Sequence, residues 1–218
     1  MYYIRKLIYL FVFIGFSACH AGSYDDFFTA ISRDNVRALN ALLARGFDPN
    51  TVNPEGQYAL LVALRQDSFG AAKLLISQPS TQVDVRTDKD ETPLMLAALK
   101  GQIDLCRQLL ERDADVNKTG WTPLHYAATG GHADVVRLLL EHYAYVDAES
   151  PNRTTPLMMA AMYGTADAVQ ALLDGGADVQ LKNAQGLTAL DFAQKNDNSP
   201  TVQPILAALQ AINRKAGW

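Results

Sequence analysis

Apolar residues recur at helical spacing in short segments of this chain, with polar and glycine-rich turns between them. The clearest segment, TPLHYAATGGHADVVRLLL, begins at Thr122 and places Leu124, Ala127 and Ala128 at i, i+3 and i+4, which is one apolar stripe on a helix. The threonine can cap that helix, and Pro123 suits its first position because no backbone donor is needed there. A second apolar stripe follows two glycines, so the segment predicts two antiparallel helices joined by a tight turn.

The same pattern recurs along the chain at a period of roughly 33 residues. Its starting slot is filled in turn by Tyr58, Thr92, Thr122, Thr155 and Thr188. A degenerate first copy precedes them and keeps the second helix and the closing Gly-x-Asp-x-Asn, but not the Thr-Pro start. The copies cover about 24–53, 54–87, 88–117, 118–150, 151–183 and 184–214. Because neither helix of a copy can bury its stripe alone, neighbouring copies must stack, and function should lie on a surface rather than in a deep cavity.

The segments TPLHYAA, GHADVVRLLL, GADV and ADVN resemble the ankyrin repeat, and the resemblance covers nearly everything after the first 22 residues. It implies an all-α solenoid of about six helix-turn-helix units joined by short β-hairpin fingers, with a concave face built from the fingers and the first helices. It also implies a non-enzymatic scaffold or adaptor that binds a protein partner.

Several copies depart from this pattern where backbone geometry matters. The spacing before Thr122 predicts a short finger at 117–121, and residues 78–81 lengthen the loop after the second helix of the second copy. Arg153 occupies the glycine slot of a finger, and Tyr143 occupies the glycine slot after a second helix. Holding a non-glycine residue in the left-handed conformation costs about 1 kcal/mol, so we expect Tyr143 to mark a re-routed helix end.

The first 21 residues have the three-part pattern of a secretory signal peptide. Arg5 and Lys6 precede an apolar run from Leu7 to Phe16, and small residues follow. The run is too short for a membrane-spanning helix, which needs about 20 apolar residues. We expect cleavage after Ala21 and a periplasmic location, because the chain then resembles exported bacterial ankyrin-repeat proteins.

An alternative is a lipidation site at Cys19, since the stretch from Phe16 to Cys19 resembles a bacterial lipobox. The mature chain would then be an outer-envelope lipoprotein, and only in that case would it contact a membrane. A secreted, host-directed effector is a further alternative. If cleavage follows Ala21, Cys106 is the single remaining thiol, and its place on an apolar helix face predicts an inert, buried side chain.

Composition and motifs argue against other classes of protein. Hydrophobic residues make up 49% of the 218 residues, which suits one folded domain over 22–218, and no basic stripe is present that would favour nucleic acid. His125, His132 and His142 lie on different faces and lack the partners of a metal site. The resemblance implies instead that His125 contacts the Thr122 hydroxyl and the backbone of the next finger. No catalytic or phosphate-binding motif occurs, so we expect no enzyme activity, cofactor or small-molecule substrate.

Candidate partner contacts are residues free of packing duty, at the fingers and after the alanine pair of each first helix. Exposed aromatic and apolar side chains at such positions are typical of protein-binding hot spots. We assign the partner-binding set to Trp121, Tyr163, Met162, Leu99, Lys100, Glu91, Arg153 and Thr154. The alternative is that Trp121 shields the short finger and that Met162 and Leu99 fold back onto an adjacent copy.

Overall fold

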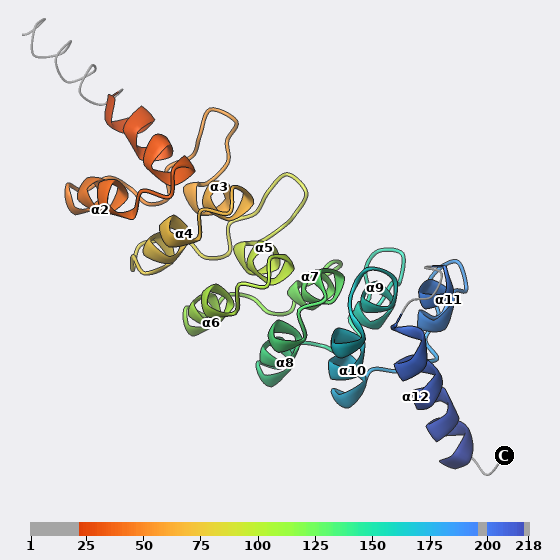
Figure 1. Cartoon of the computed structure of the whole chain (residues 1–218). Helices are drawn as coiled ribbons and strands as arrows, with labels where there is room; N and C mark the ends of the chain where they lie inside the picture. The colour runs from red at the N-terminus through yellow and green to blue at the C-terminus, as the bar shows by residue number, and fades with distance from the viewer. Residues whose placement is uncertain (1–21, 196–199, 216–218) are drawn as a thin grey trace, which may run out of the picture. The chain divides into compact units, whose positions relative to one another are not determined.

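A computed structural model describes residues 22–195 and 200–215 of the chain (Figure 1). The expected signal peptide and the candidate lipidation site Cys19 lie outside the described residues. The chain divides into two compact units, Met1–Thr81 and Gln82–Trp218. In the described parts of both units, no helix combines the length and the apolar character that crossing a membrane would require.

The first unit consists of a helix over residues 22–32, followed by α2 (Val36–Ala44), α3 (Ala59–Arg65) and α4 (Phe69–Ile76). Helix α4 packs against both α2 and α3. The apolar stripes of the helices form the core, with exposed fractions of at most 1% for Phe27, Ile31, Leu39, Leu60, Leu64 and Leu75. The ring of Phe27 stacks on that of Phe47 with the centroids 4.4 Å apart, so the N-terminal helix belongs to the core of this unit.

The second unit repeats one helix pair along the chain: α5 (Pro93–Leu99) with α6 (Ile103–Glu111), α7 (Pro123–Gly130) with α8 (Ala133–Glu141), α9 (Pro156–Tyr163) with α10 (Ala166–Asp174), and α11 (Ala189–Gln194) with α12 (Val202–Lys215). The first helices α5, α7, α9 and α11 pack side by side in one row, and α6, α8, α10 and α12 form a second row (Figure 1). The alanine pair of α7, Ala127 and Ala128, is fully buried, because small side chains let neighbouring helices pack closely. The expected all-α stack of helix-turn-helix units is confirmed.

The first helices of the second unit begin at the threonines that the sequence indicates. The hydroxyl oxygens of Thr92 and Thr155 accept hydrogen bonds from the backbone N–H groups of Met95 and Met158, at 3.3 and 3.4 Å. The threonine N–H groups in turn donate to the methionine sulfur atoms at 3.4 and 3.5 Å. In α7 the corresponding acceptor is Nδ1 of His125, at 3.2 Å. The third residue of each helix therefore completes the cap with its side chain.

The longer fingers are hairpin turns closed by backbone hydrogen bonds. The N–H groups of four residues donate to the carbonyl oxygen four positions further on: Asn53 at 2.9 Å, Thr87 at 3.0 Å, Ser150 at 3.1 Å and Asn183 at 3.0 Å. Among the described residues, strand-like pairing is limited to one isolated β-bridge, between Val52 and Tyr58. The expected hairpin shape is thus present, but it is too short to form strands.

The finger at 117–121 is short, as the spacing predicts, and a lysine closes it. The side chain of Lys118 is only 4% exposed. Its ammonium group donates to the carbonyl oxygens of Thr119 at 3.2 Å and Trp121 at 3.3 Å, and it forms a short ion pair with Asp90 of the preceding finger. That contact is the main cause of the lowered pKa of the Asp90 carboxyl. A buried lysine therefore takes the place of the backbone pairing of the longer fingers.

The expectation of a re-routed helix end at Tyr143 is wrong. This residue takes the left-handed conformation of the glycine that it replaces, with φ of +63°, and Gly176 at the equivalent place has φ of +91°. The N–H of Tyr143 donates to the carbonyl of Leu140 at 3.0 Å, and the following N–H donates to that of Leu139 at 2.9 Å. The same two bonds close the helix end at Gly176. Helix α8 therefore ends as α10 does, and the tyrosine itself carries the backbone strain.

Candidate partner-binding surfaces

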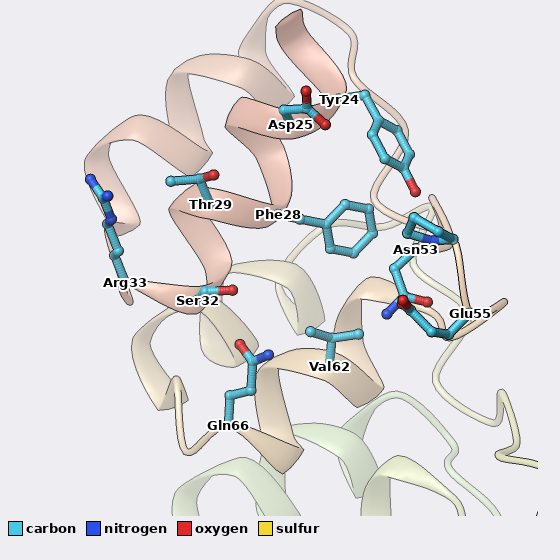
Figure 2. A pocket seen from close by; sticks show the side chains of 11 residues that line it. Tyr24, Asp25, Phe28, Thr29, Ser32, Arg33, Asn53, Glu55, Val62 and Gln66 are labelled. Carbon is cyan, nitrogen blue, oxygen red and sulfur yellow. The ribbon is translucent and has the colours of Figure 1, made fainter. Parts of the chain in front are cut away.

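An open hollow of about 540 Å³ lies in the first unit, between the N-terminal helix, the finger at 53–55 and α3 (Figure 2). Figure 2 shows the ring of Phe28 reaching from the N-terminal helix into the space above Val62 of α3, with Tyr24 beside it. The remaining lining residues are mostly polar: Asp25, Thr29, Ser32, Arg33, Asn53, Pro54, Glu55 and Gln66. The hollow thus has an apolar floor and a polar rim.

The aromatic floor of the hollow is fixed by contacts within the first unit. The hydroxyl of Tyr24 donates to the carbonyl oxygen of Val52 at 2.7 Å. The Tyr24 ring lies 5.2 Å from the ring of Phe28, which meets the buried Phe27 edge-on at 5.4 Å. The half-buried ring of Phe28 is therefore held in place before any ligand arrives, which lowers the entropic cost of binding.

Charged groups line the rim of the hollow. The carboxylates of Asp25 and Glu55 are exposed, and within the described residues neither has an ion-pair or hydrogen-bond partner. Arg33 lies at the other end of the N-terminal helix segment, as Figure 2 shows. Asn53 is occupied within the finger, where its Oδ1 accepts the N–H of Gln57 at 2.8 Å. This arrangement suits the side chains of a protein partner, which would bury apolar surface on the floor and meet charges at the rim.

This hollow was not part of the predicted partner-binding set. The candidate positions were counted from the threonine slot, and the first copy of the repeat has no such slot. A signal was nevertheless present in the adjacent pair Phe27 and Phe28, because successive residues of a helix point in different directions and both cannot face one core.

Four predicted contact residues lie at the C-terminal ends of first helices in the second unit. Leu99 and Lys100 stand at the end of α5, and Met162 and Tyr163 at the end of α9. Helix α7 packs against both of these helices. Tyr163 is 59% exposed, Lys100 is exposed, and Leu99 and Met162 are half-buried. Tyr163 therefore offers a partner the most open ring of this group.

Trp121 and Glu91 are half-buried, and each contacts α7. The indole of Trp121 meets the ring of His125 edge-on with the centroids 5.1 Å apart. A carboxylate oxygen of Glu91 accepts the hydroxyl of Tyr126 at 3.2 Å. The indole of Trp121 therefore covers part of the start of α7, and its remaining surface stays open. Tyr126 joins the same surface although it was not predicted.

Arg153 and Thr154 are neighbours in one finger and differ in exposure. The guanidinium of Arg153 is exposed and pairs with Glu149 at 3.2 Å, and its backbone has φ of +60° in the glycine slot. Thr154 is only 2% exposed. Its N–H donates to the Ser150 hydroxyl at 3.0 Å, and its carbonyl oxygen lies 2.9 Å from Nε2 of His125. The assignment of Thr154 to the partner-binding set is therefore corrected, because this residue closes the finger from inside.

His125 makes the two contacts that the resemblance implies. Its Nδ1 lies 2.9 Å from the hydroxyl oxygen of Thr122 and accepts the N–H of that residue, so Nε2 carries the proton and donates to the carbonyl of Thr154. The side chain is fully buried, and burial lowers its pKa to about 4. The imidazole is therefore neutral at pH 7 and links the start of α7 to the next finger.

The remaining histidines and the buried cysteine were considered as metal ligands or reactive groups. Within the residues that the structure describes, no three His, Cys, Asp or Glu side chains come together to hold a metal ion. Nε2 of His132 lies 3.1 Å from the carbonyl oxygen of Leu99, whereas His142 is exposed after α8. Cys106 is buried as a free thiol, and burial raises its pKa to about 12, so it is protonated and unreactive at neutral pH.

Comparisons with known proteins agree with this architecture. The family described as Ankyrin repeats (3 copies) matches the chain over residues 27–119, 80–150 and 145–216. Similar curated proteins include Ankyrin repeat and SAM domain-containing protein 6 of Danio rerio, which is 33% identical over 46% of this chain and 18% of its own length. Neurogenic locus notch homolog protein 4 of Homo sapiens is 37% identical over 36% of this chain and 4% of its own length. Alpha-latrocrustotoxin-Lt1a of Latrodectus tredecimguttatus is 33% identical over 42% of this chain and 6% of its own length. The chain therefore spans at most 18% of the length of each of these relatives.

Proposed function

The chain belongs to the ankyrin repeat family, and from this premise we propose that it is a non-enzymatic scaffold that binds a protein partner on the face built from its fingers and first helices. Such repeats share one packing pattern and differ in the residues that they present, so the partner is selected by surface side chains. Hereafter the finger and first-helix side of each unit is called its inner face, which carries the hollow in the first unit and the ends of α5, α7 and α9 in the second.

The hollow of the first unit supports this proposal most directly. It places the fixed ring of Phe28 between two open carboxylates, Asp25 and Glu55, on the finger and first-helix side of the unit. An apolar partner side chain on that floor would gain about 25 cal/mol for each Å² buried. The carboxylates at the rim would favour a positively charged neighbour and disfavour a negatively charged one.

In the second unit, the inner face offers a similar combination of exposed ring and charge. Tyr163 supplies an open aromatic ring at the end of α9, and Lys100 supplies a cation at the end of α5. Arg153 and the half-buried Tyr126 add polar groups to the same set. Aromatic and arginine side chains are the types that dominate binding energy at protein interfaces.

We also propose that the chain acts in the periplasm after cleavage behind Ala21, on the pattern of residues 1–21. The intact mass of the protein isolated from its native cells tests this step. A mature N-terminus at Gly22 is expected. A lipidated N-terminus at Cys19 would contradict the soluble form and support an anchored lipoprotein.

In-cell photo-crosslinking tests the inner face and captures whichever partner binds there. A benzophenone amino acid replaces one exposed residue at a time: Glu55 and Tyr163 on the inner face, and Lys73 of α4 and Arg137 of α8 on second helices as matched controls. Each unit thus contributes one test position and one control. All four side chains are exposed, and that of Tyr163 is 59% exposed. The substitutions should therefore leave folding intact.

We expect a discrete adduct of one size at Glu55 or Tyr163 after irradiation, and none at the two control positions. Adducts restricted to Lys73 and Arg137 would place the partner on the second helices and contradict the proposal. Absence of any adduct at all four positions would equally contradict a partner bound on this face.

A further inference from the structure

Tyr143 and Tyr145 project from the loop that follows α8. They are 86% and 70% exposed, the highest values among the large apolar side chains of the described residues. This loop follows a second helix, whereas the inner face consists of fingers and first helices, so the two tyrosines form a separate surface. Two exposed aromatic rings only two residues apart are typical of an interaction site.

Tyr143 stands where the repeat normally places a glycine. Its backbone is left-handed at φ of +63°, like Gly46 at +88° and Gly176 at +91° after the equivalent helices, and Asp113 after α6 is likewise left-handed at +59°. A bulky side chain destabilises this conformation, and the same helix-closing hydrogen bonds would form with glycine. The ring is thus retained at a cost to folding.

Tyr145 stands where other copies place an aspartate with a defined structural role. The Oδ1 atoms of Asp48, Asp115 and Asp178 accept the N–H of the residue two positions on, at 2.9, 3.0 and 2.9 Å. A tyrosine has no acceptor at that distance from its backbone, so this copy lacks the bond. Two neighbouring positions therefore both break the local pattern in favour of an exposed ring, which is typical of a functional site.

Asn117 holds the backbone of both tyrosines. Its Nδ2 donates to the carbonyl of Tyr143 at 2.8 Å, and its Oδ1 accepts the N–H of Tyr145 at 2.8 Å. The backbone that carries the two tyrosine rings is therefore held against the preceding copy of the repeat. Because this backbone is already ordered, a ligand that binds the rings adds little entropic cost for ordering the loop.

The surroundings of the two tyrosines are strongly acidic. Helix α8 packs against α6 and α10, and the ends of these three helices with the loops after them carry eight carboxylates: Glu111, Asp113, Asp115, Glu141, Asp147, Glu149, Asp174 and Asp178. The cations in the same segments are Arg112, Lys118, Arg153 and Lys182, and the imidazole of His142 lies there too. Glu149 already pairs with Arg153, but most of the carboxylates remain exposed. A ligand of negative charge would be repelled here.

We propose that Tyr143 and Tyr145 bind an arginine-bearing segment of a polypeptide partner. A guanidinium group stacks on the face of an aromatic ring and pairs with carboxylates at the same time, so the rings and the acidic surroundings recognise one side chain together. The charge of the surface excludes nucleic acid and anionic lipid as occupants. This surface is independent of the inner face, and either can fail without the other.

Fluorescence anisotropy with a labelled hexa-arginine peptide tests the proposal on the full chain at physiological salt. The informative variant is Tyr143→Gly with Tyr145→Asp, which restores the residues of the other copies. It removes both rings while adding one negative charge. We expect the dissociation constant for hexa-arginine to rise at least ten-fold, while the thermal midpoint of unfolding stays the same or increases.

Two control variants separate ring recognition from general attraction. Tyr143→Phe with Tyr145→Phe keeps both rings and should retain most of the affinity, because the ring face and not the hydroxyl takes the cation. Ile212→Ala, at an exposed apolar residue of α12 that belongs to neither surface, should bind hexa-arginine like the unaltered protein. Equal or tighter binding by the Gly and Asp variant would show simple charge attraction and overturn the proposal, as would an unaltered protein that does not bind the peptide.

Discussion

At the scale of single residues, His125 shows how a buried side chain can link two parts of the fold. It accepts a hydrogen bond at the start of α7 through Nδ1 and donates one to the finger carbonyl of Thr154 through Nε2. The bond that Nδ1 accepts requires the neutral ring, whereas Nε2 donates in either protonation state, and burial lowers the pKa of the imidazole from 6.5 to about 4. The folded protein therefore binds a proton at this site less readily than the unfolded chain does.

Stability should consequently fall as the pH is lowered through the unfolded pKa of 6.5 toward 4. Between these values the unfolded chain takes up a proton that the folded protein does not, so the contribution of His125 is complete above pH 6.5 and decreases below it. The expected loss is about 3 kcal/mol by pH 4. Urea unfolding at pH 7.5 and pH 4 measures it.

The matched control is His125→Met, because Met95 and Met158 fill this slot in other copies. This variant has no imidazole to titrate, so its free energy of unfolding should fall less between the two pH values than that of the unaltered protein. The carboxylates of both proteins contribute equally to the change. Parallel losses in the two proteins would assign the acid sensitivity to carboxylates and contradict the role given to His125.

Some residue roles could be predicted from the sequence, and others depended on neighbours far along the chain. The two contacts of His125 follow the repeat pattern, because both partners occupy fixed places in it. The burial of Thr154 did not, because its exposure depends on the turn that Ser150 and Asn152 form around it. The methionine sulfur atoms that accept the threonine N–H groups were also not expected, since methionine is ordinarily a packing residue.

Among the elements, the helices could be predicted from the sequence, but the closure of the short finger and the end of α8 could not. The short finger at 117–121 was visible in the spacing, but its closure by the buried Lys118 was not, because lysine normally stays in water. The partner of this lysine, Asp90, lies in the preceding finger, and periodicity contains no information on such contacts. A finger that loses its backbone pairing is thus stabilised by the neighbouring finger instead.

At the helix end at Tyr143, the sequence predicted a change of path that the structure does not have. The cost of a left-handed tyrosine led to the expectation that the chain would avoid this conformation, but the bonds that close α8 outweigh a strain of about 1 kcal/mol. A helix end in a repeat is fixed by its packing between neighbours as well as by its own residues. A local penalty therefore marks a candidate functional residue more reliably than it predicts a change in path.

At the scale of the whole molecule, the repeat pattern determined the fold class because each unit is stabilised by its immediate neighbours. The binding surface was less accessible to prediction. Its positions were counted from the threonine slot, so the first copy, which lacks the slot, contributed no candidate residue. The structure instead shows a hollow between that copy and the second one, around Phe28 and Val62.

Hydrogen–deuterium exchange measures directly whether a protein partner binds on the fingers and first helices. Exchange would be measured on the full chain alone and with the partner identified by cross-linking. We expect slower exchange in the fingers at 53–57, 87–91, 117–121 and 150–154, and at the C-terminal ends of α5 and α9, with little change in α6, α8 and α10. Slower exchange confined to α6, α8, α10 and the loops after them would contradict binding of the partner on the fingers and first helices.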